Sequence, residues 1–125
     1  MDTASDVLFA DFWRGLAHPI RIRILQLLRE RGSLTVSELV ATLGLGQGHV
    51  SNHLSCLRNC GFVRAEPDGR FVRYALADGR IATLLEVGAD VWRDHVLGVA
   101  ACAVVREEAS AGAEAVAVPR PEVAG

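Results

Sequence analysis

The stretch TVSELVATLGLGQGHVSNHLSCLRNCG, from Thr35 to Gly61, predicts two short helices joined by a tight turn. Thr35 and Glu38 have the spacing of a capping box, in which each side chain accepts a hydrogen bond from the other residue's backbone amide. Gly44 stands where the first helix would end in a left-handed conformation. The second helix should bury an apolar stripe made of Val50, Leu54 and Leu57. Two short helices with such a turn form a helix-turn-helix.

Two further helices are predicted before this stretch. Residues 5–17 place apolar side chains at helical spacing, and His18-Pro19 should end that helix. Pro19 suits the first turn of the next helix, which Gly32 should terminate. The predicted buried stripe of this second helix is Ile20, Ile24, Leu27 and Leu28.

A β-hairpin and a long helix are predicted after it. Residues 62–66 and 70–76 are rich in aromatic and β-branched residues and flank Pro67-Asp68-Gly69, a turn sequence. Asp78 precedes a long amphipathic helix whose stripe should keep helical phase as far as Cys102. The predicted fold class is therefore mainly α with a small β-hairpin, a winged helix-turn-helix.

Residues 1–108 are expected to form one DNA-binding and dimerisation domain. Residues 109–125 contain no aromatic residue and are expected to be a flexible C-terminal tail. The first and last helices are more apolar than a small core can cover, which predicts a homodimer through those two helices.

The composition limits the class of protein. Thirteen arginines against 15 acidic residues give a net charge of −2, unlike the strongly basic balance of a non-specific nucleic-acid binder, so any DNA contact must be local. The N-terminus lacks an export signal, and the longest apolar run, residues 96–105, is shorter than the roughly 20 residues that span a membrane. A cytoplasmic protein without membrane contact is expected, and its three cysteines should be thiols or metal ligands.

The second helix of the helix-turn-helix carries short polar side chains opposite its buried stripe. The candidates for base or phosphate contact are Gln47, His49, Ser51 and Asn52. Ser51 and Asn52 are also compatible with being plain solvated residues. Arg70 and Arg73 are placed for a wing that contacts phosphates or the minor groove, although arginines on an exposed hairpin also deter edge-to-edge aggregation. A dimer would present two such helices about 34 Å apart, so double-stranded operator DNA with an inverted repeat is the expected partner.

Cys56 and Cys60 are four residues apart, which places both sulfurs on one helical face. Soft thiolates select thiophilic metals. With Cys102 as the remaining cysteine, three sulfurs favour Cd(II) or Pb(II), whereas a structural Zn(II) site usually has four ligands, which leaves Zn(II) possible. The alternative is that all three are small buried hydrophobic residues.

The other three histidines, His18, His53 and His95, are predicted to have structural roles. His95, beside Asp90 and Asp94, suggests a second site for a harder ion, but no second histidine follows it. A histidine on an amphipathic helix is more often an interface residue. His18 and His53 are better explained as packing or capping residues than as metal ligands.

Most of residues 8–106 resemble the ArsR/SmtB family of metal-responsive winged helix-turn-helix repressors, through residues 16–25, 50–58, 61–63 and 69–76. Within it the sequence is most similar to the CmtR-type cadmium- and lead-sensing branch. That resemblance implies that Cys56 and Cys60 bind the metal together with Cys102 of the other subunit. Gly46-Gln47-Gly48 departs from the serine or threonine often found there, and the cysteine pair of arsenic-sensing relatives and the Asp-x-His pattern of zinc-sensing relatives are absent.

The sequence therefore predicts a metal-sensing transcriptional repressor that binds operator DNA as an apo dimer and is released by Cd(II) or Pb(II). The alternative is a thiol-based redox-responsive repressor of the same fold. A thiol enzyme is not expected, because no general base in a pocket-forming loop accompanies Cys56 or Cys60, and no small organic substrate is expected. An architectural DNA binder with inert cysteines is a further alternative.

Overall fold

The protein is described from a computed structural model, which describes residues 2–102. Its described residues fall into two compact units, which divide between Ala82 and Thr83. The predicted domain boundary at residue 108 and the predicted tail, 109–125, lie outside the described residues.

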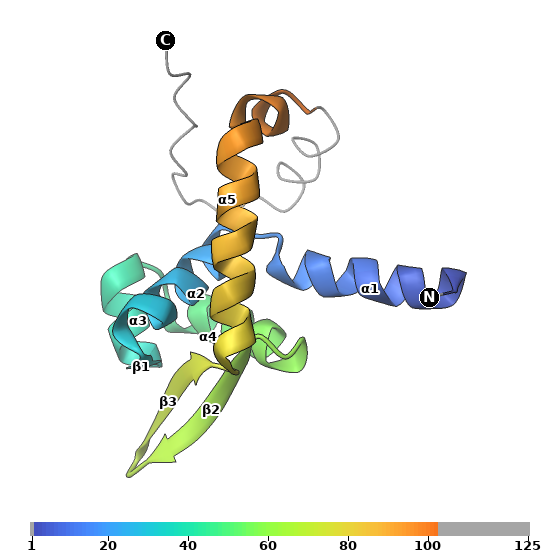
Figure 1. Cartoon of the computed structure of the whole chain (residues 1–125). Helices are drawn as coiled ribbons and strands as arrows, with labels where there is room; N and C mark the ends of the chain where they lie inside the picture. Colours follow the sequence, from blue (N-terminus) through green and yellow to red (C-terminus); the bar gives the residue numbers. More distant parts are fainter. Residues whose placement is uncertain (1, 103–125) are drawn as a thin grey trace. The chain divides into compact units, whose positions relative to one another are not determined.

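The two helices predicted at the N-terminal end are confirmed (Figure 1). Helix α1 spans Thr3–Leu16, and the Asp2 side chain caps it by accepting a hydrogen bond from the Ser5 amide at 2.8 Å. Helix α2 spans Pro19–Arg31 and ends at Gly32, whose φ of 86° favours glycine. Nδ1 of His18 accepts from the Ile20 amide at 3.1 Å, so the predicted capping role of His18 is confirmed.

The helix-turn-helix is also confirmed. Helix α3 spans Val36–Leu43, with the Thr35–Glu38 capping box formed and Gly44 in the left-handed conformation at φ 70°. Helix α4 spans Gln47–Asn59. Burial of one side of each helix holds the motif together, and the fully buried side chains are Ile20, Ile24, Leu25, Leu27, Leu28, Leu39, Val50, Leu54, Leu57 and Phe62.

The predicted hairpin is part of a three-stranded antiparallel sheet. Strands β2 (Val63–Asp68) and β3 (Phe71–Leu76) form the hairpin, and β1 (Ser33–Thr35), which was not predicted, pairs with the other edge of β3. Pro67 and Asp68 lie in β2 and not in the turn, which is limited to residues 69–70. Proline is tolerated at residue 67 because β2 is an edge strand and one side of it needs no amide donor.

Helix α5 spans Gly79–Ala101 and is broken at His95, where φ is −129° and ψ is 16°. The Asp78 carboxylate accepts from the Arg80 amide at 2.8 Å, and its hydrogen bonds to Arg80 lower the pKa of Asp78 to about 2. Cys102 follows the helix end, so the prediction that one stripe keeps helical phase as far as Cys102 is wrong. A single non-helical residue is enough to shift the phase of everything after it.

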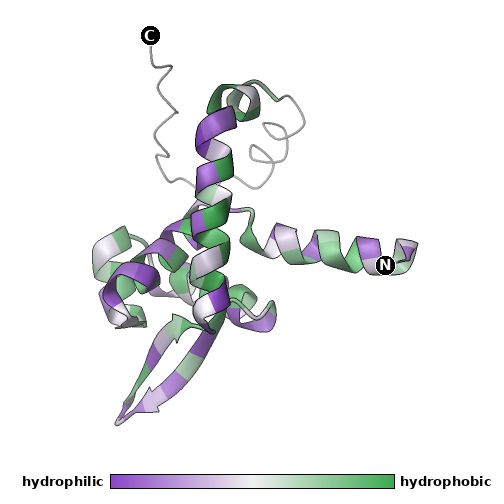
Figure 2. Cartoon of the chain, viewed as in Figure 1, coloured by the Kyte–Doolittle hydropathy of each residue, from purple (hydrophilic) through white to green (hydrophobic). Residues whose placement is uncertain are grey.

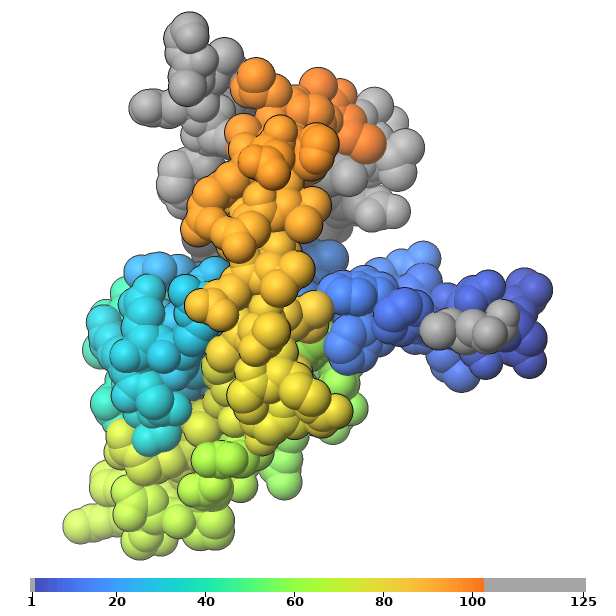
Figure 3. All heavy atoms as spheres, viewed as in Figure 1, coloured from blue at the N-terminus to red at the C-terminus, as the bar shows by residue number. Residues whose placement is uncertain are grey.

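Apolar residues recur along both helices that were predicted to be too apolar for a small core (Figure 2). Much of α1 stands clear of the other elements of its own unit (Figure 3). The exposed large side chains are Val7, Leu8, Phe9 and Trp13 on α1, and Val87, Val91, Trp92, Leu97 and Val99 on α5. Within residues 2–102, no helix has the length and apolarity that a bilayer crossing requires.

Two glycine-to-alanine substitutions should change stability in opposite directions. Gly44→Ala places a Cβ at φ 70° and should destabilise the fold by about 1–2 kcal/mol, whereas Gly48→Ala, within α4, should stabilise it by about 0.5–1 kcal/mol. Neither added Cβ meets another atom within 4 Å, so backbone conformation alone separates the two. Urea unfolding at one protein concentration measures both. Equal effects would contradict the helix boundaries given above.

Candidate nucleic-acid interface and thiol pair

The four polar residues predicted to contact DNA lie in the first half of α4. Gln47, His49 and Asn52 are exposed, and Ser51 is half-buried. Gly46, the N-cap, has no side chain to cap the helix, so the first amides of α4 are not covered by a capping side chain. An uncapped helix N-terminus is a suitable partner for a phosphate group. The contacts themselves stay predictions.

Behind this surface, a buried histidine joins α4 to the α1–α2 junction. His53 is only 4% exposed, which confirms its predicted packing role. Its Nδ1 accepts a hydrogen bond from Nε of Arg21 at 3.1 Å, and the same guanidinium donates to the Gly15 carbonyl at 3.1 Å. The His53 ring also lies 4.5 Å from that of His18, centroid to centroid. Sequence reasoning missed the role of Arg21, because its partners lie 6 and 32 residues away.

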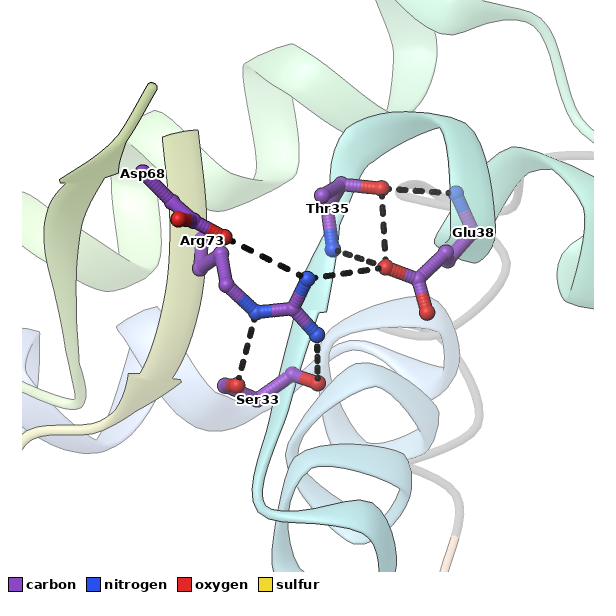
Figure 4. Close-up of polar contacts among 5 residues, drawn as sticks. All are labelled: Ser33, Thr35, Glu38, Asp68 and Arg73. Atoms are coloured by element: carbon purple, nitrogen blue, oxygen red, sulfur yellow. Dashed lines mark hydrogen bonds and ion pairs between the residues drawn. The ribbon is translucent and has the colours of Figure 1, made fainter. Parts of the chain in front are cut away.

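The two arginines predicted for the wing have different surroundings. Arg70 is exposed in the hairpin turn, and its guanidinium carbon lies 5.9 Å from the ring centroid of Phe71. Arg73 is half-buried on β3, and its guanidinium bonds to Ser33 and lies near Glu38 and Asp68 (Figure 4). DNA contact by either arginine stays a prediction.

Cys56 and Cys60 lie at the opposite end of α4 from the candidate DNA contacts. Both are free thiols, and both are half-buried. Burial raises the pKa of Cys60 above its ordinary value, and the neighbouring Cys56 raises it further through its charge and a hydrogen bond, while Arg21 opposes the shift. The two sulfurs are thus close enough to interact. Such a pair would fit one thiophilic ion, since the positive charge of the ion would offset the repulsion between the two thiolates that form when the protons leave.

The end of α1 packs directly on Cys60, one member of this thiol pair. Gly15 is buried, and a Cβ built on it would lie 2.7 Å from Sγ of Cys60. The ring of Phe12, one turn earlier, lies 4.7 Å from that of Phe62, centroid to centroid. Because Gly15 touches Cys60, a displacement of the Cys60 side chain would act on α1 directly, without any element between them.

Cys102, the third predicted ligand, is exposed and belongs to the second unit. Among residues 2–102 of a single chain, no three His, Cys, Asp or Glu side chains form a group that could hold a metal ion. Within these residues, His95, Asp90 and Asp94 do not form such a group by themselves, and a second site that uses residues after 102 lies outside the described residues. A site completed by a partner subunit is not tested by one chain and stays a prediction.

Comparisons with known proteins identify the family. Residues 18–65 match the family described as bacterial regulatory protein, arsR family. The chain is 40% identical to a probable mercury resistance operon repressor of Streptomyces lividans over 93 residues, 74% of each protein. It is 54% identical over 72 residues to the transcriptional regulator CmtR of Mycobacterium tuberculosis, and the matched segment covers 58% of this chain and 60% of CmtR.

Solved structures agree with this result. The crystal structure of Rv0081 from Mycobacterium tuberculosis is 38% identical, with a TM-score of 0.71, and the match covers 81% of this chain and all of that one. The NMR structure of the cadmium metal-sensor CMTR from the same organism is 52% identical, with a TM-score of 0.53, over 60% of this chain and 76% of that one. A homodimeric winged helix-turn-helix domain from Mycobacterium bovis is 27% identical, with a TM-score of 0.68, over 76% and 89%.

Gly15→Ala should destabilise the protein by about 1–3 kcal/mol, because the new methyl group overlaps Sγ of Cys60. Cys60→Ala removes that sulfur. In a double-mutant cycle, Gly15→Ala should therefore cost less in the Cys60→Ala background than in the wild type, by about 1 kcal/mol or more. Urea unfolding of the four proteins measures it. Additive effects would show that α1 does not rest on this thiol.

Alkylation of Cys60 by iodoacetamide should reach half its maximal rate at a higher pH in the folded protein than in urea, because burial raises the pKa of this thiol. The shift has a second cause that can be removed. In Cys56→Ala, the pH at which Cys60 alkylation reaches half its maximal rate should fall. It should stay above the value for the denatured protein, since burial is the larger cause. Peptide mass spectrometry follows the residue. Coincident folded and denatured profiles would contradict the assigned environment.

Proposed function

The chain belongs to the arsR family of bacterial regulatory proteins, and we propose that it is a metal-responsive repressor that binds operator DNA as a dimer when metal-free and is released by Cd(II) or Pb(II). One observation carries this proposal above all. Helix α4 holds a thiol pair, Cys56 and Cys60, at one end and exposed polar residues suited to base edges at the other. One relative of known structure is titled a cadmium metal-sensor.

The proposed DNA contacts come from α4 and the hairpin. α4 enters the major groove, and its polar residues contact bases or phosphates. Arg70, exposed in the turn after Gly69, contacts the phosphate backbone or the minor groove. The full set of α4 contacts is Gln47, His49, Ser51 and Asn52. The chain's net charge of −2 is consistent with contacts confined to these two elements.

The proposed dimer forms through α1 and α5. Both helices expose large apolar side chains, among them Leu8, which is 70% exposed, and Val91, which is 59% exposed. Such surfaces are costly in water and are normally covered by a partner. A two-fold axis would use the same surface of both copies and would place the two α4 helices for an inverted repeat. A relative of similar fold is described as homodimeric.

Cys56 and Cys60 of one subunit, with Cys102 of the other, are the proposed ligands. Three thiolates suit a large thiophilic ion, which is why Cd(II) or Pb(II) is favoured and Zn(II), which prefers a closed set of four ligands, is a weaker candidate. The relatives named above include a mercury resistance operon repressor, another protein linked to a thiophilic metal.

Release follows from the contacts of the thiol pair with α1. Drawing Cys56 and Cys60 toward a shared ion moves the end of α4 on which Gly15 rests. Arg21 transmits the same change, since it holds both the Gly15 carbonyl and His53 of α4. Because α1 lies in the proposed dimer interface, the spacing of the two α4 helices then changes. A difference of about 1–3 kcal/mol in DNA-binding free energy between the two arrangements is typical of such coupling.

The redox alternative receives less support from the thiol environment. A redox-sensing cysteine normally has a depressed pKa, so that the reactive thiolate is populated at neutral pH. The raised pKa of Cys60 works in the opposite direction. Mass analysis after peroxide treatment separates the two functions, since a redox sensor would gain a disulfide or a sulfenate.

Substituting each proposed ligand should abolish the metal response without removing DNA binding. In Cys56→Ser, Cys60→Ser and Cys102→Ser, the metal-free proteins should bind the duplex that the wild type selects, yet Cd(II) should no longer release them. The sulfur-to-metal charge-transfer absorption should fall in parallel. Gel shifts and ultraviolet titration measure both. Unchanged release in all three variants would refute the proposal.

Mixed dimers test whether the ligands come from two subunits. A chain carrying Cys102→Ser, paired with one carrying Cys56→Ser and Cys60→Ser, keeps one complete site only if the third sulfur is supplied in trans. The mixed dimer should then regain one Cd(II) per dimer, whereas neither parent homodimer binds Cd(II) tightly. No recovery would place all ligands within one chain.

A further inference from the structure

The guanidinium of Arg73, on β3, reaches three other elements of the first unit (Figure 4). Its Nε donates to Oγ of Ser33 at 3.0 Å, and its Nη2 donates to the Ser33 carbonyl at 3.1 Å, which ties β3 to β1. Its Nη1 lies 3.5 Å from Oε1 of Glu38 on α3 and 3.9 Å from Oδ2 of Asp68 on β2. All three guanidinium nitrogens are thus directed at protein oxygens.

The Glu38 carboxylate makes this arrangement specific. Its Oε1 also accepts from the Thr35 amide at 3.2 Å and from the Thr35 hydroxyl at 3.1 Å, so the atom that Arg73 approaches is part of the capping box of α3. The hydrogen bonds to Thr35 lower the pKa of Glu38, and the charge of Arg73 lowers it further. The carboxylate is therefore ionised whenever the protein binds DNA near neutral pH.

We propose that Arg73 is a positioning residue, which fixes the hairpin relative to the helix-turn-helix and does not itself contact DNA. This inference rests on the proposed DNA-binding function and gives Arg73 a different role from the contact predicted from sequence. The short strand β1 pairs with the hairpin strand β3 and leads directly into α3. A planar group that holds β1, β2, β3 and the first turn of α3 keeps the wing and α4 in one fixed arrangement, so less order has to be created on binding.

Salt dependence separates a positioning role from a phosphate contact. Loss of one phosphate contact lowers the slope of log K against log[salt] by about 0.9. Arg73→Gln should leave that slope unchanged while weakening binding about tenfold, because a hairpin that is less ordered in the free protein has to be ordered on binding. Arg70→Gln is the matched comparison, for which the slope should fall. The probe is a duplex that the wild-type protein selects from a random-sequence pool.

Two conservative variants sharpen the test. Arg73→Lys keeps the charge but cannot hold both Ser33 oxygens with a planar fork, so it should bind as weakly as Arg73→Gln. A phosphate contact would instead survive in the lysine variant. Glu38→Gln keeps the capping box but loses the ion pair with Arg73. Positioning predicts weaker binding, whereas simple charge removal near DNA would predict tighter binding.

Hydrogen exchange of the free protein provides a readout that needs no DNA. In Arg73→Gln, amides of β1 and β3 should exchange faster, while those in the middle of α4 keep wild-type protection. A reduced salt slope in Arg73→Gln, or wild-type affinity with wild-type exchange, would overturn the inference. If the wild type selects no duplex, the proposed function fails, and the exchange result still decides whether Arg73 fixes the hairpin.

Discussion

One face of helix α4 is buried away from water, and the opposite face is exposed to solvent. This division determines where the other functional residues of the first unit lie. Val50, Leu54 and Leu57 are almost completely buried, and each contributes about 1.5–3 kcal/mol relative to an exposed position. Their burial fixes the rotation of α4 about its axis. That rotation directs the polar first half outward, directs His53 inward toward Arg21, and places Cys60 beside α1.

Features encoded by neighbouring residues could be predicted from the sequence. The Thr35–Glu38 capping box, the stop at Gly44 and the proline start of α2 depend on local backbone chemistry, and all three are present. Strand β1 was missed because three residues are too few to show alternation, and they are a strand only through pairing with β3. The break at His95 has no glycine or proline to mark it, and we have no physical account of it.

The candidate site divides in the same way. Spacing alone indicated that Cys56 and Cys60 share a helical face, and their mutual effect on the Cys60 pKa agrees with this. Gly15 packs against Cys60, and Arg21 donates hydrogen bonds to both Gly15 and His53. These contacts join residues far apart in sequence, so no local sequence pattern predicts them. An arginine on a predicted wing suggests a DNA contact. The contacts of Arg73 on β1, α3 and β2 exist only once the sheet has formed, so they could not be predicted from local sequence.

The interruption of α5 at His95 has a mechanical consequence for the sulfur that follows it. Residues 96–102 form an arm about 10 Å long beyond the interruption, at the rise of an α-helix. A rotation of about 20° at His95 would move Cys102, at the end of this segment, by about 3–4 Å. This distance is comparable with the rise of two helical residues. The third thiol can thus be repositioned by two backbone torsions, leaving the apolar first part of the helix undisturbed.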